Sequence, residues 1–193
     1  TYRRIVGFSW AVVLSSLAGV LHGQVQRMWI GALLGPQFVT SFHLGVWGPA
    51  KVNGATVALS EPLFPRAAAG GRGLQETYYR MLALTAILSL VALLPVMVVP
   101  DLLFGWWFRG HPPAHVAEIA RVVSFGLFCN AIGHPAHHML NGQGRPWVNT
   151  VFALASPVVL YAVLEGLHRA RGTLDVLDFA WATTLSLGTI SVL

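Results

Sequence analysis

Long apolar stretches alternate with short polar segments along the whole of this 193-residue chain. An α-helix needs about 20 mostly apolar residues to cross a hydrocarbon core of about 30 Å. The first five stretches reach that length, and the sixth is shorter where the sequence stops. The pattern therefore predicts an all-α, polytopic bundle of about six membrane spans: Ile5–Leu34, Phe38–Phe64, Tyr78–Phe104, Ala117–Leu140, Trp147–Leu167 and Phe179–Leu193.

The two ends of the sequence resemble positions inside a longer protein. Thr1 stands where a complete protein would have methionine, and Arg3 and Arg4 follow it as in a loop that enters a helix. The last apolar stretch ends at Leu193, before it is long enough to span a membrane. We therefore expect residues 1–193 to form one transmembrane bundle of a larger protein, with a truncated last span.

Composition favours the membrane over the other classes. Hydrophobic residues make up 55% of the chain and charged residues 10%, whereas a soluble domain has about 25% charged residues. The apolar stretches repeat along the chain, so a removable signal peptide does not explain them. The twelve basic residues are scattered and form no patch with interleaved aromatic residues, so we expect no nucleic-acid partner. The single Cys129 excludes an intrachain disulfide.

Arginines are distributed unevenly between alternate loops, which predicts the orientation in the membrane. One set of loops, on the side of the N-terminus, carries Arg3, Arg4, Arg66, Arg72 and Arg145. The opposite side carries Arg109, Arg169 and Arg171 together with five acids, Asp101, Glu118, Glu165, Asp175 and Asp178. Because loops rich in Lys and Arg stay in the cytoplasm, we expect the first set to be cytoplasmic.

Two basic residues lie within predicted spans, where charge is least expected. Lys51 is near the middle of the second span, about 20 Å of helix from the turn at Gly35–Pro36. Arg27 lies about 12 Å before that turn, on the first span. A charge at such depth costs from about 2.5 kcal/mol upward, so it normally faces a bundle interior or a water-filled cavity. Lys51 and Arg27 are therefore the leading candidates for a binding site.

Other polar residues surround these two charges if the first two spans pack as a hairpin. We expect a polar, net-positive cavity suited to an anionic ligand such as phosphate or pyrophosphate. An alternative is that Arg27 reaches to the membrane interface and that Lys51 pairs with Glu61 or with a residue elsewhere in the protein. The remaining candidates for the cavity are His22, Gln24, Gln26, His43, Asn53, Thr56 and Glu61.

The histidines suggest a second hypothesis. His111–His115 reads HxxxH and His134–His138 reads HxxHH, and both resemble histidine boxes of membrane-bound di-iron enzymes. A helix between them would place the boxes about 30 Å apart, at opposite faces of the membrane, and a third box is missing. No GxSxG, Walker or HExxH motif is present either. We therefore expect neither a metal centre nor an enzyme.

Three segments resemble motifs of one transporter family. Gln24–Pro36, in which Arg27 precedes a Gly-x-x-Leu-Gly-Pro turn, resembles the seventh-helix motif of bacterial polysaccharide flippases. Leu140–Pro146 resembles that family's Leu-x-Gly-x-Gly-Arg-Pro loop, and Leu63–Arg66 resembles the end of its eighth helix. The motifs occur in the family's order across essentially the whole chain. Gln26 stands where the family usually has an acid, which argues against acid-dependent ion coupling at that position.

The resemblance is to the Wzx-like polysaccharide and O-antigen flippases of the multidrug/oligosaccharidyl-lipid/polysaccharide exporter superfamily. It implies that the chain is the second of two six-helix bundles around a central cavity, lined by Arg27 and Lys51. The implied function is to flip undecaprenyl-diphosphate-linked oligosaccharide across the bacterial inner membrane by alternating access. The implied partners are that lipid-linked oligosaccharide, membrane lipids and the N-terminal helix bundle of the same protein. The coupling ion would be H⁺ or Na⁺, with no other cofactor.

Alternatives to this function remain open. One is another exporter of the same superfamily, either a drug/cation antiporter or a peptidoglycan-precursor flippase. Drug antiporters favour acids in the cavity, whereas the deep charges here are mainly basic. A non-transporting membrane scaffold would instead require Arg27 and Lys51 to be neutralised by fixed partners, with no cavity.

Overall fold

The structure, a computed structural model, describes residues 2–190, except for the side chains of Arg3, Arg4 and Ile190. Within this part of the chain every regular element is a helix, which confirms the predicted all-α fold. The helices are α1 (Tyr2–Leu33), α2 (Pro36–Ala58), α3 (Leu63–Ala69), α4 (Leu74–Val98), α5 (Pro100–Trp107), α6 (Val116–Gly142), α7 (Pro146–Arg171) and α8 (Val176–Ile190).

Glycine and proline set several of the helix boundaries. Gly35, with φ 105°, makes the turn between α1 and α2, a conformation that costs other residues far more than glycine. Pro36 and Pro146 are the first residues of α2 and α7, where the missing N–H of proline has no helical partner to lose. Gly172, with φ 75°, ends α7 in the left-handed conformation. The predicted turn at Gly35–Pro36 is therefore confirmed.

Two predicted spans extended too far. The predicted second span, Phe38–Phe64, stops at Ala58, and a turn separates it from α3. The third, Tyr78–Phe104, is divided because α4 ends at Val98 and α5 begins at Pro100. Proline disfavours a helical conformation in the residue before it, and Val99 accordingly lies outside the helix at φ −126° and ψ 48°. Hydrophobicity continues through the second break, at Val99, so it could not locate that one, whereas Ser60, Glu61 and Pro62 at the first break are residues typical of a turn.

Four helices are long and apolar enough to cross a membrane: Ile5–Leu33, Leu74–Val98, Val116–Gly142 and Pro146–Arg171. These helices are a feature of membrane proteins and agree with four of the predicted spans. The other two predicted spans correspond to α2 and α8. Neither meets the same standard of length and apolar character, since α2 carries several polar residues, among them His43, Lys51 and Asn53, and α8 has 15 residues.

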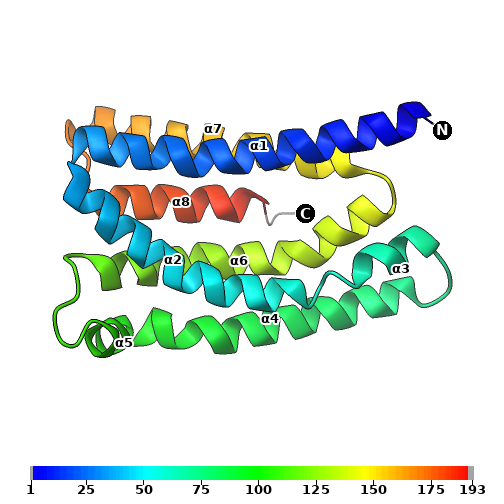
Figure 1. Ribbon diagram of the computed structural model, residues 1–193, viewed down its shortest axis with the longest axis horizontal. Coiled ribbons are helices and arrows are strands. Elements are labelled where there is room, and N and C mark those ends of the chain that lie inside the picture. Colours follow the sequence, from blue (N-terminus) through cyan, green and yellow to red (C-terminus); the bar gives the residue numbers. More distant parts are fainter. Residues whose placement is uncertain (1, 191–193) are drawn as a thin grey trace.

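The helices are arranged in layers, with α6 at the centre (Figure 1). Helices α1 and α7 lie side by side in one layer, and α8 lies between that layer and α6. Helices α2 and α4 pack on α6 from the other side, together with the short α3 and α5. The main core joins these layers through fully buried side chains such as Ile30 of α1, Leu93 of α4, Ile119 of α6 and Phe179 of α8.

The first two helices do not run side by side as the sequence predicted. They meet near the turn at Gly35 and then diverge, α1 toward α7 and α2 toward α4 and α6 (Figure 1). Helix α8 packs against α7 and α6 between the two layers, and its Phe179 is completely buried there. Burial of a large aromatic side chain is worth about 1.5–3 kcal/mol where water is the alternative. The predicted hairpin therefore opens around α8.

Candidate functional site

Lys51 is an exposed cation in the middle of α2. Its Nζ atom lies 5.9 Å from the centre of the Trp47 ring, a cation–π distance, and no ion pair joins it to Glu61. Among the described residues Lys51 has no carboxylate partner at all. The alternative that Glu61 neutralises Lys51 is therefore not realised in this structure.

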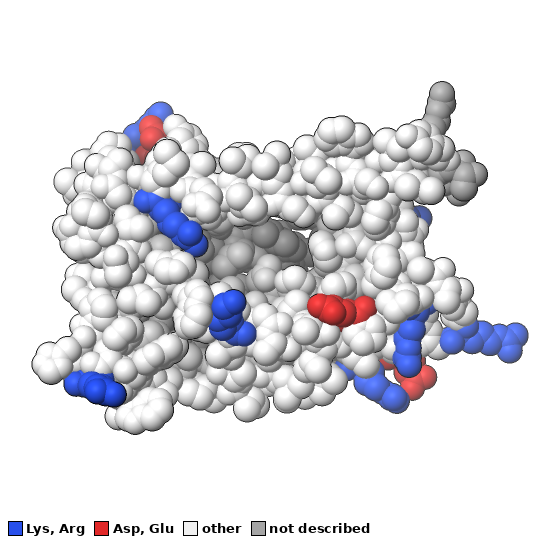
Figure 2. All heavy atoms as spheres, in the orientation of Figure 1, with Lys and Arg blue, Asp and Glu red and all other residues white. Residues whose placement is uncertain are grey.

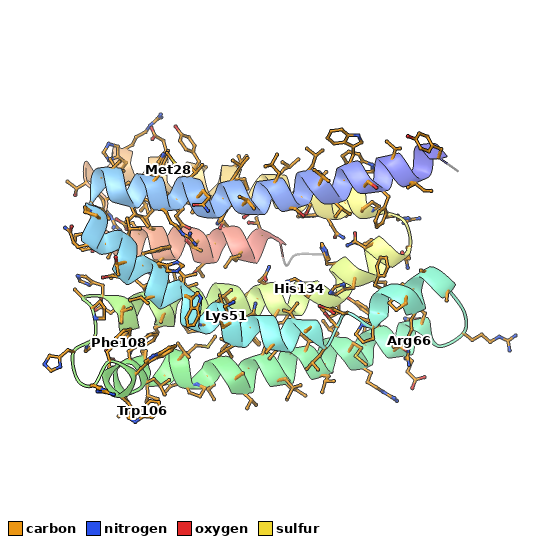
Figure 3. The ribbon with its side chains drawn as sticks, in the orientation of Figure 1. Met28, Lys51, Arg66, Trp106, Phe108 and His134 are labelled. Atoms are coloured by element: carbon orange, nitrogen blue, oxygen red, sulfur yellow. The ribbon has the colours of Figure 1, made fainter. Side chains whose placement is uncertain are left out.

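A hollow separates the two layers on one face of the molecule. Figure 2 shows it between the described surfaces of α1 and α2, with both basic and acidic side chains at its rim; its interior is drawn in grey and lies outside the described residues. Lys51, labelled in Figure 3 in the same orientation, lies on α2 at the edge of this hollow. Apart from these charged side chains, the described surface around it is white in Figure 2, that is, uncharged. An unpaired cation thus borders a hollow in a largely apolar protein.

Arg27 is the second cation predicted for the site. It is exposed on the last third of α1 and forms no ion pair with any described residue. Gln24, one turn earlier, is exposed as well. Arg27 lies on α1 and Lys51 on α2. Because these two helices diverge, their contact is confined to the region of the turn.

Gln26 has a different position from its neighbour Arg27. Its side chain is only 5% exposed, and its Nε2 donates hydrogen bonds to Thr183 Oγ1 and, at 3.4 Å, to the carbonyl oxygen of Phe179. Both partners belong to α8. Gln26 therefore joins α1 to α8, which is the ordinary use of a polar side chain between membrane helices.

His22 lies between α1 and α7. Its Nδ1 is 3.4 Å from Ser156 Oγ, and its Nε2 is buried without a partner. His22 and Gln26 line the same cavity of about 170 Å³, whose other walls are mostly apolar side chains of α1 and α7. This cavity is distinct from the surroundings of Lys51, which does not line it.

The polar residues of α2 point in several directions. His43 is exposed, whereas Asn53 is buried and its Oδ1 has no partner. Thr56 Oγ1 is 2.8 Å from Ser89 Oγ, a hydrogen bond that joins α2 to α4. Glu61 is exposed in the turn after α2 and lies close enough to His138 of α6 to act on it electrostatically. The nine predicted site residues are thus divided among several surroundings.

The two histidine boxes lie at opposite ends of α6. His115 immediately precedes this helix and bonds to Glu118 through its Nδ1, at 2.9 Å, whereas His134 is in its C-terminal half. Nineteen residues of continuous helix correspond to about 28 Å. Among the described residues, no group of three or more His, Cys, Asp or Glu side chains is placed to hold a metal ion.

The second histidine box forms a polar cluster with neighbouring asparagines, which the sequence analysis did not predict. The rings of His134, His137 and His138 lie 5.7–6.1 Å apart, and asparagines bond to two of them. His134 pairs with Asn130 and His137 with Asn141, each four residues away on α6. This i,i+4 spacing, visible in the sequence, marks a polar stripe on one helix face.

The geometry of these residues is the available guide to their chemistry. Comparison with protein-family models, with curated proteins and with solved structures finds no match to this chain.

Proposed function

We infer that this chain is part of a transporter that moves undecaprenyl-diphosphate-linked oligosaccharide across a bacterial inner membrane. The observation that carries the proposal is the exposed Lys51 of α2, which has no carboxylate partner among the described residues of a helical membrane protein. An intramembrane cation without a carboxylate partner needs water or an anionic ligand. The resemblance of three ordered sequence segments to polysaccharide flippases supplies the identity of the anion, a lipid pyrophosphate.

The mechanism that follows is electrostatic. Lys51, with Arg27 as a second cation, neutralises the pyrophosphate while the sugars pass through the hollow. The N-terminal bundle of the same protein would close the hollow from the opposite side, and rocking of the two bundles would give alternating access. In this proposal α2 and α8 complete six spans, because a span that directs a polar face at a cavity need not be apolar on every side.

The positive charge of Lys51 and Arg27 favours an anionic substrate, and therefore this function over drug export. A cationic drug would be repelled by Lys51, and neither Lys51 nor Arg27 has a carboxylate partner among the described residues to reverse the local charge. A peptidoglycan-precursor flippase handles the same pyrophosphate and is therefore the second candidate. The two differ in the sugar that follows the phosphate.

The test is lipid translocation by the full-length protein in liposomes. We expect fluorescent undecaprenyl-diphosphate oligosaccharide to cross the bilayer faster than in protein-free liposomes, as measured by quenching with a membrane-impermeant reductant, and an H⁺ or Na⁺ gradient to increase the rate. A peptidoglycan precursor serves as the second substrate. Translocation of that precursor alone would favour the second candidate, and a rate equal to that of empty liposomes would contradict both.

A further inference from the structure

A second cavity lies within the bundle, away from Lys51. It has a volume of about 180 Å³ and is lined by residues of α1, α6 and α7. Its walls are formed by Ser15, Asn130, Gly133, His134, His137, Asn149, Phe152 and Ala153. No Asp, Glu, Lys or Arg is among these lining residues. The cavity therefore offers hydrogen-bonding groups without a fixed charge.

The hydrogen bonds around the cavity determine which groups remain open. Asn149 Nδ2 donates to Asn141 Oδ1 at 2.8 Å and to the carbonyl oxygen of His137 at 3.0 Å. Asn141 must then use its own Nδ2 as the donor to His137 Nε2, at 3.0 Å, which leaves the proton of a neutral His137 on Nδ1. Asn149 is only 5% exposed, so this network also holds α7 against α6.

Two buried atoms in this network lack a partner, and both are acceptors. His134 Nε2 lies 3.2 Å from Asn130 Oδ1 and donates to it, so a neutral His134 has its lone pair on Nδ1. That Nδ1 and Asn149 Oδ1 are buried without hydrogen bonds. A buried polar atom left unpaired costs about 1–3 kcal/mol. Both atoms belong to side chains that line the cavity, so a ligand that donates hydrogen bonds would suit it.

This preference selects the chemistry of the ligand. Phosphate and other fully ionised anions only accept hydrogen bonds and would leave both atoms unpaired. A metal cation has no carboxylate to neutralise it among the lining residues. Hydroxyl groups donate as well as accept, and a sugar ring also has an apolar face that can pack on Phe152. Small-molecule sites commonly combine apolar walls with a few placed polar groups in this way.

The position of the cavity suits a sugar on a lipid carrier. His134 lies in the C-terminal half of α6 (Figure 3), and Asn149 is three residues after Pro146 at the start of α7. Pro146 lines a larger cavity of about 750 Å³, together with Arg145, Trp147 and residues near the start of α1. The small cavity thus lies within one helical turn of a basic, aromatic cleft at the helix ends.

We propose that the cavity between α1, α6 and α7 binds one uncharged sugar ring, with Asn149 Oδ1 and His134 Nδ1 accepting hydrogen bonds from its hydroxyls. This site rests on the proposed function, because it supplies a sugar-binding subsite separate from Lys51. Its volume has room for several water molecules or a single ring. It would therefore hold one unit of the oligosaccharide while the phosphates lie elsewhere.

The test measures binding of simple sugars to the full-length protein in lipid nanodiscs. The probes are methyl glucoside, methyl galactoside, methyl rhamnoside and N-acetylglucosamine, observed by saturation-transfer NMR. We expect at least one to give a signal that is lost in Asn149→Ala and in Ala153→Trp, which fills the cavity without removing a hydrogen bond. Val151→Trp, at an exposed position two residues away on α7, is the matched control and should retain the signal.

The outcomes separate this site from the transport function. Absence of saturation transfer from all four sugars to the wild-type protein would overturn the sugar site and would mean that only water occupies the cavity. An equal signal in wild type and Ala153→Trp would overturn it as well, since binding would then lie elsewhere. Size-exclusion chromatography of each variant shows whether it is folded. Lipid translocation measured in liposomes is a separate readout, so a failure of the sugar site can be distinguished from a failure of the proposed function.

Discussion

Replacing Lys51 with alanine in the full-length protein will reduce glycan export by at least about tenfold without lowering the amount of protein in the membrane. A hydrogen bond to a charged group contributes about 1.5–3 kcal/mol, and each 1.36 kcal/mol corresponds to a factor of ten in rate. Stability should change little, because Lys51 is exposed and its contact with Trp47 is worth about 0.5–1 kcal/mol. Export is measured as surface glycan, and protein abundance by immunoblotting.

Two control variants define the meaning of this result. Lys51→Arg keeps the positive charge and should retain most of the export activity. Arg72→Ala removes an exposed cation from the loop before α4 and should leave export unchanged. Unchanged export in Lys51→Ala would remove Lys51 from the proposed site, and equal losses in Lys51→Ala and Arg72→Ala would indicate a general effect of charge.

Gly126→Ala is expected to destabilise the protein. A Cβ atom at Gly126 of α6 would lie 2.7 Å from Thr184 Cα and 3.1 Å from Thr184 O of α8. These are backbone atoms, so the two helices must separate to accommodate the methyl group, and Thr184 Oγ1 also donates to Val122 O of α6 at 2.9 Å. Overpacking of this kind costs about 1–3 kcal/mol. The thermal midpoint should fall by about 2–4 °C for each kcal/mol lost.

Gly166→Ala is the matched control, because Gly166 is also a helical glycine but has nothing within 4 Å of its added Cβ. Alanine is favoured over glycine within a helix by about 0.5–1 kcal/mol, so this variant should be as stable as the wild type or more so. Both variants are compared in detergent by the temperature dependence of their helical circular dichroism. Equal midpoints for Gly126→Ala and wild type would contradict the close packing of α6 on α8.

The sequence predicted the helical fold well because membrane spans have a strong local signal. The turn at Gly35–Pro36 and the start of α7 at Pro146 could also be located from residue types alone. The arrangement of the spans was harder to predict, because every span is apolar on most sides. Nothing in the sequence indicated that α8 would lie between the layer of α1 and α7 and helix α6.

The site could be predicted only in part, and the reason is related. A polar residue in a span either lines a cavity or bonds to a neighbouring helix, and the sequence does not distinguish the two uses. Gln26 was expected in one cavity with Lys51 but bonds to α8 and lines a separate cavity, and Thr56 bonds to Ser89 of α4. Lys51 could be singled out because no neutral neighbour can satisfy a full charge. The asparagines near His134 and His137 were overlooked because the histidines were considered only as metal ligands.

Solvent accessibility of position 51 tests most directly the claim that a basic, water-filled path runs beside α2. Lys51→Cys is introduced into a full-length protein whose other cysteines, including the exposed Cys129, are replaced by serine. A charged, membrane-impermeant maleimide is then applied to intact membranes. We predict rapid labelling of Lys51→Cys, slowed by lipid-linked oligosaccharide, and no labelling of Val91→Cys at an exposed apolar position on α4. If Lys51→Cys were as unreactive as Val91→Cys, position 51 would face lipid or packed protein, and the proposed path would be wrong.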